Sequence, residues 1–119
     1  MLFDNFYMPP DIKTARKALF SYLIKQGFQL RPNYPITFQN GLTDAIDMLA
    51  FKEDKKYAII LGKKSIRKRY KIMFDAMETR EEYTKIVILC GARLEDDSEH
   101  KDGVYYINVR GTAAYAKGY

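Results

Sequence analysis

The chain has few of the residues that join small proteins covalently or through metals. Its 119 residues include one cysteine, Cys90, one histidine, His100, and no tryptophan. A lone cysteine cannot form an internal disulfide, and one cysteine with one histidine cannot complete a four-ligand zinc site. We therefore expect a domain that depends on its hydrophobic core and resides in a reducing compartment, the cytoplasm.

Long apolar runs are also missing. No stretch approaches the roughly 20 consecutive apolar residues that a membrane-spanning helix needs. The first residues, 1–4, carry no basic segment of the kind that opens a secretory signal. Because 47% of the residues are hydrophobic, the length and composition predict one domain over 1–119, with no membrane partner.

Positive charge, in contrast, is concentrated in one segment. The formal net charge is +5, and the range 63–71 holds six basic residues and no acidic one, so the rest of the chain is nearly neutral. The six are Lys63, Lys64, Arg67, Lys68, Arg69 and Lys71. Mutual repulsion favours an anionic partner for such a cluster, and we expect these residues to bind the phosphates of a nucleic acid. The alternative is a solvated helix face that binds nothing.

Periodicity and turn residues predict an α/β domain with a mixed sheet in the order α-β-β-β-α-β-β. The expected elements are a helix over 11–26, strands over 28–31, 44–51 and 57–62, a helix that Ser65 caps, and strands over 85–91 and 104–109. Asp11 is the expected N-cap of the first helix, and Gly27 ends it. Residues 1–10 are expected to be irregular, and 111–119 to form a tail or a short helix.

The connections decide how the strands pair. The polar turn over 52–56 predicts an antiparallel hairpin, whereas the helix between 57–62 and 85–91 predicts a parallel crossover. Pro32 and Pro35 indicate an irregular segment before the Asn40-Gly41 turn. The acidic stretch 95–99 is expected to be a loop.

Three short motifs lie in and next to the first three expected strands. They are Gln26-Gly27-Phe28-Gln29-Leu30, Asp44-Ala45-Ile46-Asp47-Met48-Leu49-Ala50 and Ile59-Ile60-Leu61-Gly62-Lys63. Together with the order, they resemble the PD-(D/E)XK nuclease superfamily, which includes archaeal Holliday-junction resolvases and the core of many restriction enzymes. The resemblance covers roughly 11–110 and implies a restriction-endonuclease-like fold.

The resemblance also implies a catalytic site, with one departure. In that family an aspartate and a glutamate hold Mg²⁺, and a lysine assists the attack of water on the phosphodiester. Asp47 stands at the position of the metal-binding and catalytic aspartate, and Lys63 at that of the lysine. Leu61 occupies the glutamate position and cannot bind Mg²⁺. Asp47 also has a structural interpretation, as an acid that caps a turn at a strand end.

These observations predict a nucleic-acid-binding domain of nuclease-like fold that is catalytically degenerate and needs no cofactor. One alternative is an active, Mg²⁺-dependent nuclease in which Asp75 or Glu78 supplies the missing ligand; Glu53, in the hairpin turn, is expected at the wrong end of its strand. The other alternative is a protein-interaction module, such as a homodimer that pairs strands or the aromatic C-terminus. Whether the protein is an enzyme is left open by the sequence.

Overall fold

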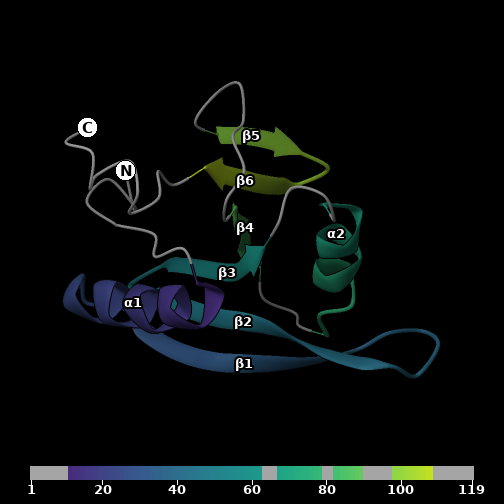
Figure 1. Cartoon of the computed structure of the whole chain (residues 1–119), viewed down its shortest axis with the longest axis horizontal. Helices are drawn as coiled ribbons and strands as arrows, with labels where there is room; N and C mark the ends of the chain where they lie inside the picture. Colours follow the sequence, from purple (N-terminus) through teal and green to yellow (C-terminus); the bar gives the residue numbers. More distant parts are fainter. Residues whose placement is uncertain (1–10, 63–66, 79–81, 90–97, 109–119) are drawn as a thin grey trace.

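The computed structural model describes residues 11–62, 67–78, 82–89 and 98–108, which form one six-stranded sheet and two helices (Figure 1). The elements are α1 (Ile12–Lys25), β1 (Gln29–Thr37), β2 (Thr43–Lys52), β3 (Lys55–Gly62), α2 (Arg67–Asp75), β4 (Thr84–Leu89), β5 (Ser98–Lys101) and β6 (Val104–Asn108). The strands lie in the order β1-β2-β3-β4-β6-β5.

The sheet is mixed, as the connections predict. β1, β2 and β3 pair antiparallel through two hairpins, whereas β3 and β4 pair parallel with α2 between them in the chain. β6 is parallel to β4, and β5 returns antiparallel along the outer side of β6. The expected mixed α/β sheet is therefore confirmed.

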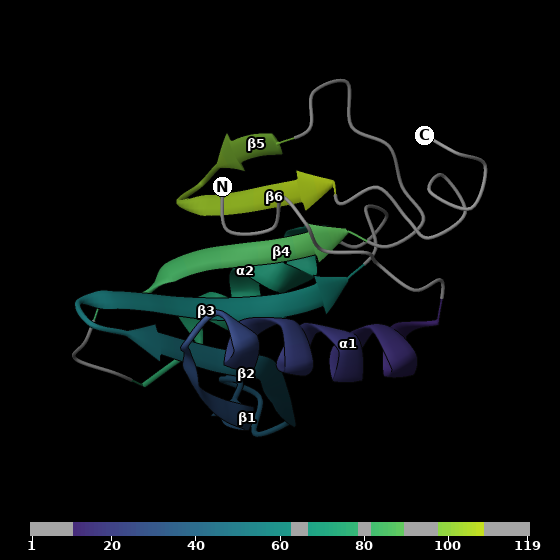
Figure 2. The same ribbon diagram turned by 90° about the vertical axis from the view of Figure 1, so that its left-hand side faces the viewer.

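One helix covers each face of the sheet, which creates two hydrophobic cores (Figure 2). In β3, Ile59 and Leu61 pack on the α1 side with Leu19, and the alternating Ile60 packs on the α2 side with Phe74. β3 is buried on both faces, which explains its continuous apolar sequence. Full burial of one such aliphatic side chain contributes roughly 1.5–3 kcal/mol.

The first helix has the ends that the sequence predicts. The Asp11 carboxylate accepts hydrogen bonds from the Thr14 backbone N–H at 2.8 Å and the Thr14 hydroxyl at 2.9 Å. These bonds stabilise the charged carboxylate and lower the pKa of Asp11 from its ordinary value. At the other end, Gly27 adopts φ +91°, a left-handed conformation that favours glycine.

Two segments that were expected to be irregular are edge strands. β1 continues through Pro32 and Pro35 to Thr37, which an edge strand permits because half of its N–H groups have no partner strand. Ser98–Lys101 forms β5, although it contains no apolar residue. Its backbone pairs with β6. The His100 ring also stacks on Tyr105 of β6, with the ring centres 4.0 Å apart. The four residues of β5 carry no hydrophobic pattern, so the prediction of a loop was wrong at 98 and 99, while 95–97 lie outside the described residues.

Candidate nucleic-acid interface

Buried side chains fix α2 against the sheet. Tyr70, Met73 and Phe74 are buried. The ring of Tyr70 lies over Gly62, where an added Cβ would come within 2.4 Å of the ring carbon Cζ. Glycine at the end of β3 therefore permits the close approach of α2, which orients the polar side of the helix away from the sheet.

Three of the six predicted phosphate-binding cations can be located in full. Lys68 and Arg69 are exposed and Lys71 is partly exposed, all on α2. Within the described ranges, Lys68 has no carboxylate partner. Lys63 and Lys64 lie outside the described residues, as does the proposed cap Ser65. Arg67 begins the helix, but its side chain is not described.

Arg69 and Lys71 each contact an acidic residue of the protein. Arg69 pairs with Asp44 of β2, and its guanidinium carbon lies 5.9 Å from the centre of the Phe38 ring. Lys71 Nζ lies 2.7 Å from Asp75 Oδ2, one turn along the helix. The pKa of Lys71 is raised because Asp75 accepts its hydrogen bond and adds a negative charge. Both pairs are open to solvent, where an incoming phosphate can compete with the carboxylate.

A third lysine, which the sequence did not reveal, joins Lys68 and Lys71. Lys101 of β5 lines a surface hollow of about 380 Å³ together with these two residues, Ile72, Tyr106, and the acids Asp75 and Asp102. Lys101 is 30 residues beyond Lys71 in the chain and stands beside acidic residues in the sequence. Only the return of β5 along β6 brings it to α2.

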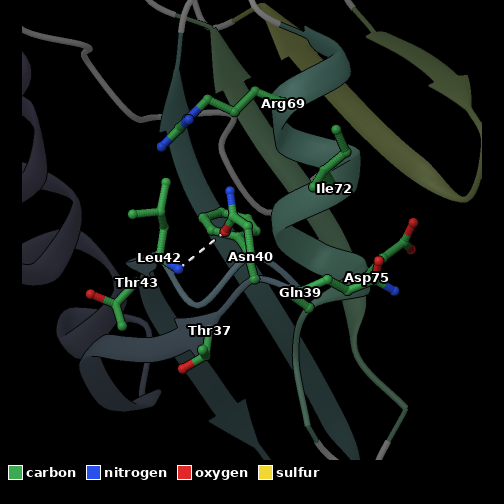
Figure 3. Close-up of a pocket in the computed structure, with 10 residues that line it drawn as sticks. Thr37, Gln39, Asn40, Leu42, Thr43, Arg69, Ile72 and Asp75 are labelled. Atoms are coloured by element: carbon green, nitrogen blue, oxygen red, sulfur yellow. Dashed lines mark hydrogen bonds between the residues drawn. The ribbon is translucent and has the colours of Figure 1, made fainter.

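A larger groove of about 840 Å³ lies on the other side of α2, between the helix and the turn that joins β1 to β2. In Figure 3, Leu42 on the hairpin and Ile72 on the helix lie on opposite sides of the groove, with Asn40 between them. Leu42 is 65% exposed and Ile72 57% exposed. The Asn40 side-chain oxygen accepts a hydrogen bond from the Leu42 N–H at 3.1 Å, which fixes the turn.

The predicted catalytic aspartate lies on the opposite face of the sheet, beside α1. Asp47 Oδ1 is 2.9 Å from Arg16 Nε and 2.8 Å from Arg16 Nη2, and Oδ2 accepts the Leu61 N–H at 2.8 Å. The Asp47 side chain is 12% exposed. Both carboxylate oxygens are thus engaged by the protein's own N–H groups.

A break in strand pairing explains this environment. β1 and β2 pair on either side of Asn33 and Asp47, but these two residues do not pair with each other, and Asn33 has a left-handed φ of +52°. Pairing of β2 with β3 ends at Met48 and Ile59. The Leu61 N–H, beyond the end of this ladder, bonds to the Asp47 side chain instead.

The donor set around Asp47 does not fit Mg²⁺. Its carboxylate contacts a guanidinium cation, and Leu61 occupies the second ligand position that the resemblance implies. The two proposed relocated acids lie elsewhere: Asp75 pairs with Lys71 on α2, and Glu78 follows α2, where its backbone carbonyl accepts the Tyr34 hydroxyl at 3.2 Å. Glu53 is in the β2–β3 turn. Among the described residues, no three acidic, histidine or cysteine side chains come together as metal ligands would.

No family model matches the chain, and no curated protein or solved structure matches it. Of the two helices that the structure describes, neither has the length and apolar character needed to cross a bilayer.

Proposed function

We propose that this protein is a cytoplasmic nucleic-acid-binding domain of restriction-endonuclease-like fold that lacks nuclease activity. The observation that carries the proposal is the convergence of Lys68, Lys71 and Lys101, from two separate elements, around one surface hollow. The resemblance of the motifs to the PD-(D/E)XK superfamily supports the same class of ligand.

Phosphate is the group that this hollow suits best. Three lysines and two aspartates line it, so the charges of its lining residues give a net positive charge at neutral pH. The sequence adds Lys63, Lys64 and Arg67 immediately before Lys68. Interactions of this kind supply affinity with little reading of base sequence, because the phosphate backbone is the same at every position.

The loss of catalysis rests on the surroundings of Asp47. The Asp47 carboxylate contacts the Arg16 guanidinium, and this cation would repel a metal ion bound to the same carboxylate. Leu61 cannot replace the second acidic ligand. Lys63, the lysine of the motif, then serves as one more cation for phosphate.

Fluorescence anisotropy with labelled DNA and RNA oligonucleotides, measured over a series of salt concentrations, tests the binding function. We expect Lys68→Ala/Lys101→Ala to weaken binding. For each duplex phosphate that the variant no longer neutralises, the log–log salt dependence should become shallower by about 0.9. The control is Lys13→Ala/Lys17→Ala, which removes two exposed lysines of α1 on the opposite face. Equal weakening in both double variants, or no binding of the native protein at low salt, would contradict the proposal.

A further inference from the structure

The two hollows beside α2 share part of one wall but differ in chemistry. Ile72 and Asp75 line both the larger groove and the lysine-lined hollow. On the β5 side, the hollow contains three lysines. On the hairpin side, the groove contains apolar side chains, hydroxyls and carboxamides. A ligand that lies across α2 would therefore meet a cationic surface on one side and a nearly neutral one on the other.

The charges in the groove are already balanced. Arg69 pairs with Asp44, and Asp75 pairs with Lys71, so the two ionised residues in the lining have internal partners. An anion that enters the groove must displace a carboxylate from one of these pairs, whereas a neutral group can enter without disturbing either pair. The lysine-lined hollow differs, because Lys68 has no carboxylate partner among the described residues.

The groove also has the size and lining of a site for a flat, polar ring. Its volume of about 840 Å³ falls within the ~300–1,000 Å³ that is usual for small-ligand sites. Leu42 and Ile72 offer exposed apolar surface on opposite sides. The Asn40 oxygen is engaged by Leu42, so its amide N–H groups are available as donors.

We propose that the groove binds an unpaired nucleobase, while the neighbouring phosphates cross α2 to Lys68, Lys71 and Lys101. This inference rests on the proposed nucleic-acid function and specifies its ligand. In a continuous duplex the faces of the bases are stacked and only their edges are accessible, so a base can enter the groove only from a single strand or a disrupted helix. The protein therefore prefers single-stranded nucleic acid to a continuous duplex.

The test compares three labelled probes of equal length in anisotropy titrations: a thymidine single strand, the same strand without bases, and a continuous duplex. We expect the native protein to bind the thymidine strand most tightly. Leu42→Ala changes a residue that lines the groove and not the lysine-lined hollow. It should weaken binding of that strand about fivefold, with less than a twofold change for the other probes, because it removes apolar surface that packs on one base. Leu42 is exposed, so the fold should be retained.

Ile24→Ala is the matched control, because Ile24 is 60% exposed on α1, on the other face of the sheet. It should leave all three affinities unchanged. If the native protein binds none of the probes at low salt, the nucleic-acid function itself fails. If it binds the base-free strand as tightly as the thymidine strand, phosphate binding stands and the base site is wrong. A change of oligomeric mass in Leu42→Ala would show that the groove contacts a second copy of the chain, which also overturns the base site.

Discussion

Asp47 is an acid whose place in the sequence fits two roles, that of a catalytic metal ligand and that of a structural hydrogen-bond acceptor. An acid in an apolar strand is typical of a catalytic site, but this carboxylate joins three elements: it lies on β2, binds Arg16 of α1, and accepts the backbone N–H of Leu61 on β3. These bonds satisfy an amide that the strand ladder leaves unpaired. The aspartate therefore has a structural role that needs no metal.

We expect Asp47→Ala to lower the free energy of unfolding by about 2 kcal/mol, because it removes a charge-assisted hydrogen bond and leaves the Leu61 amide without an acceptor. Asp47→Asn, which retains an acceptor oxygen of similar geometry, should cost less. Urea denaturation followed by circular dichroism measures both. A fully stable Asp47→Ala variant would show that these hydrogen bonds do not support the fold.

Among the elements, α1 is defined by the residues at its two ends, whereas α2 is positioned by a packing contact with the sheet. α1 begins at the Asp11 cap and ends before the left-handed Gly27, whereas α2 depends on the close approach of Tyr70 to Gly62. The cap is the feature that responds to pH. The lowered pKa of Asp11 means that its stabilising contribution is complete above the pKa of the unfolded chain and disappears as the pH falls through the folded value.

Asp11→Ala should therefore lower the midpoint temperature of unfolding at neutral pH. The difference in midpoint from the native protein should shrink as the pH falls below about 3.9, the ordinary pKa of an aspartate side chain. Asp11→Asn is the control, because asparagine caps helices well but does not titrate. Thermal unfolding at a series of pH values provides the measurement. A constant difference between native protein and Asp11→Ala at every pH would exclude the charged cap as the cause.

In the molecule as a whole, the sheet separates the predicted catalytic aspartate from the predicted phosphate-binding cations that the structure describes. Asp47 and Arg16 lie on the α1 face, and Lys68, Arg69 and Lys71 lie on the α2 face. A nuclease needs its metal ligands next to the phosphate that its cations hold. The separation supports binding without cleavage.

We accordingly expect no cleavage of labelled DNA or RNA in the presence of Mg²⁺ or Mn²⁺ under conditions in which the protein binds these nucleic acids. Asp47→Ala should behave as the native protein does in this assay. Metal-dependent cleavage by the native protein that disappears in Asp47→Ala would instead show that the aspartate releases Arg16 and acts as a ligand. The active-nuclease alternative would then replace the proposed function.

The elements that sequence reasoning located are those with strong local signals. Asp11 and Gly27 defined α1, and the apolar runs defined β2, β3 and β4. Pro32 and Pro35 misled the prediction because their cost depends on whether a strand is at the edge of the sheet, which is a tertiary property. β5 was missed because it is defined by pairing with β6, including the stacking of His100 on Tyr105, and its own sequence has no apolar alternation.

The difference between local sequence signals and tertiary contacts also applies to the site. Periodicity and charge are local along the chain, so the amino-acid order was sufficient to predict a mixed α/β domain and a short cationic segment on a helix. Which charges are available depended instead on folding, which paired Arg69 with Asp44, attached Asp47 to Arg16, and brought Lys101 next to Lys68. Electrostatic interactions depend on distances through space, and strand pairing sets those distances between residues that are far apart in the chain.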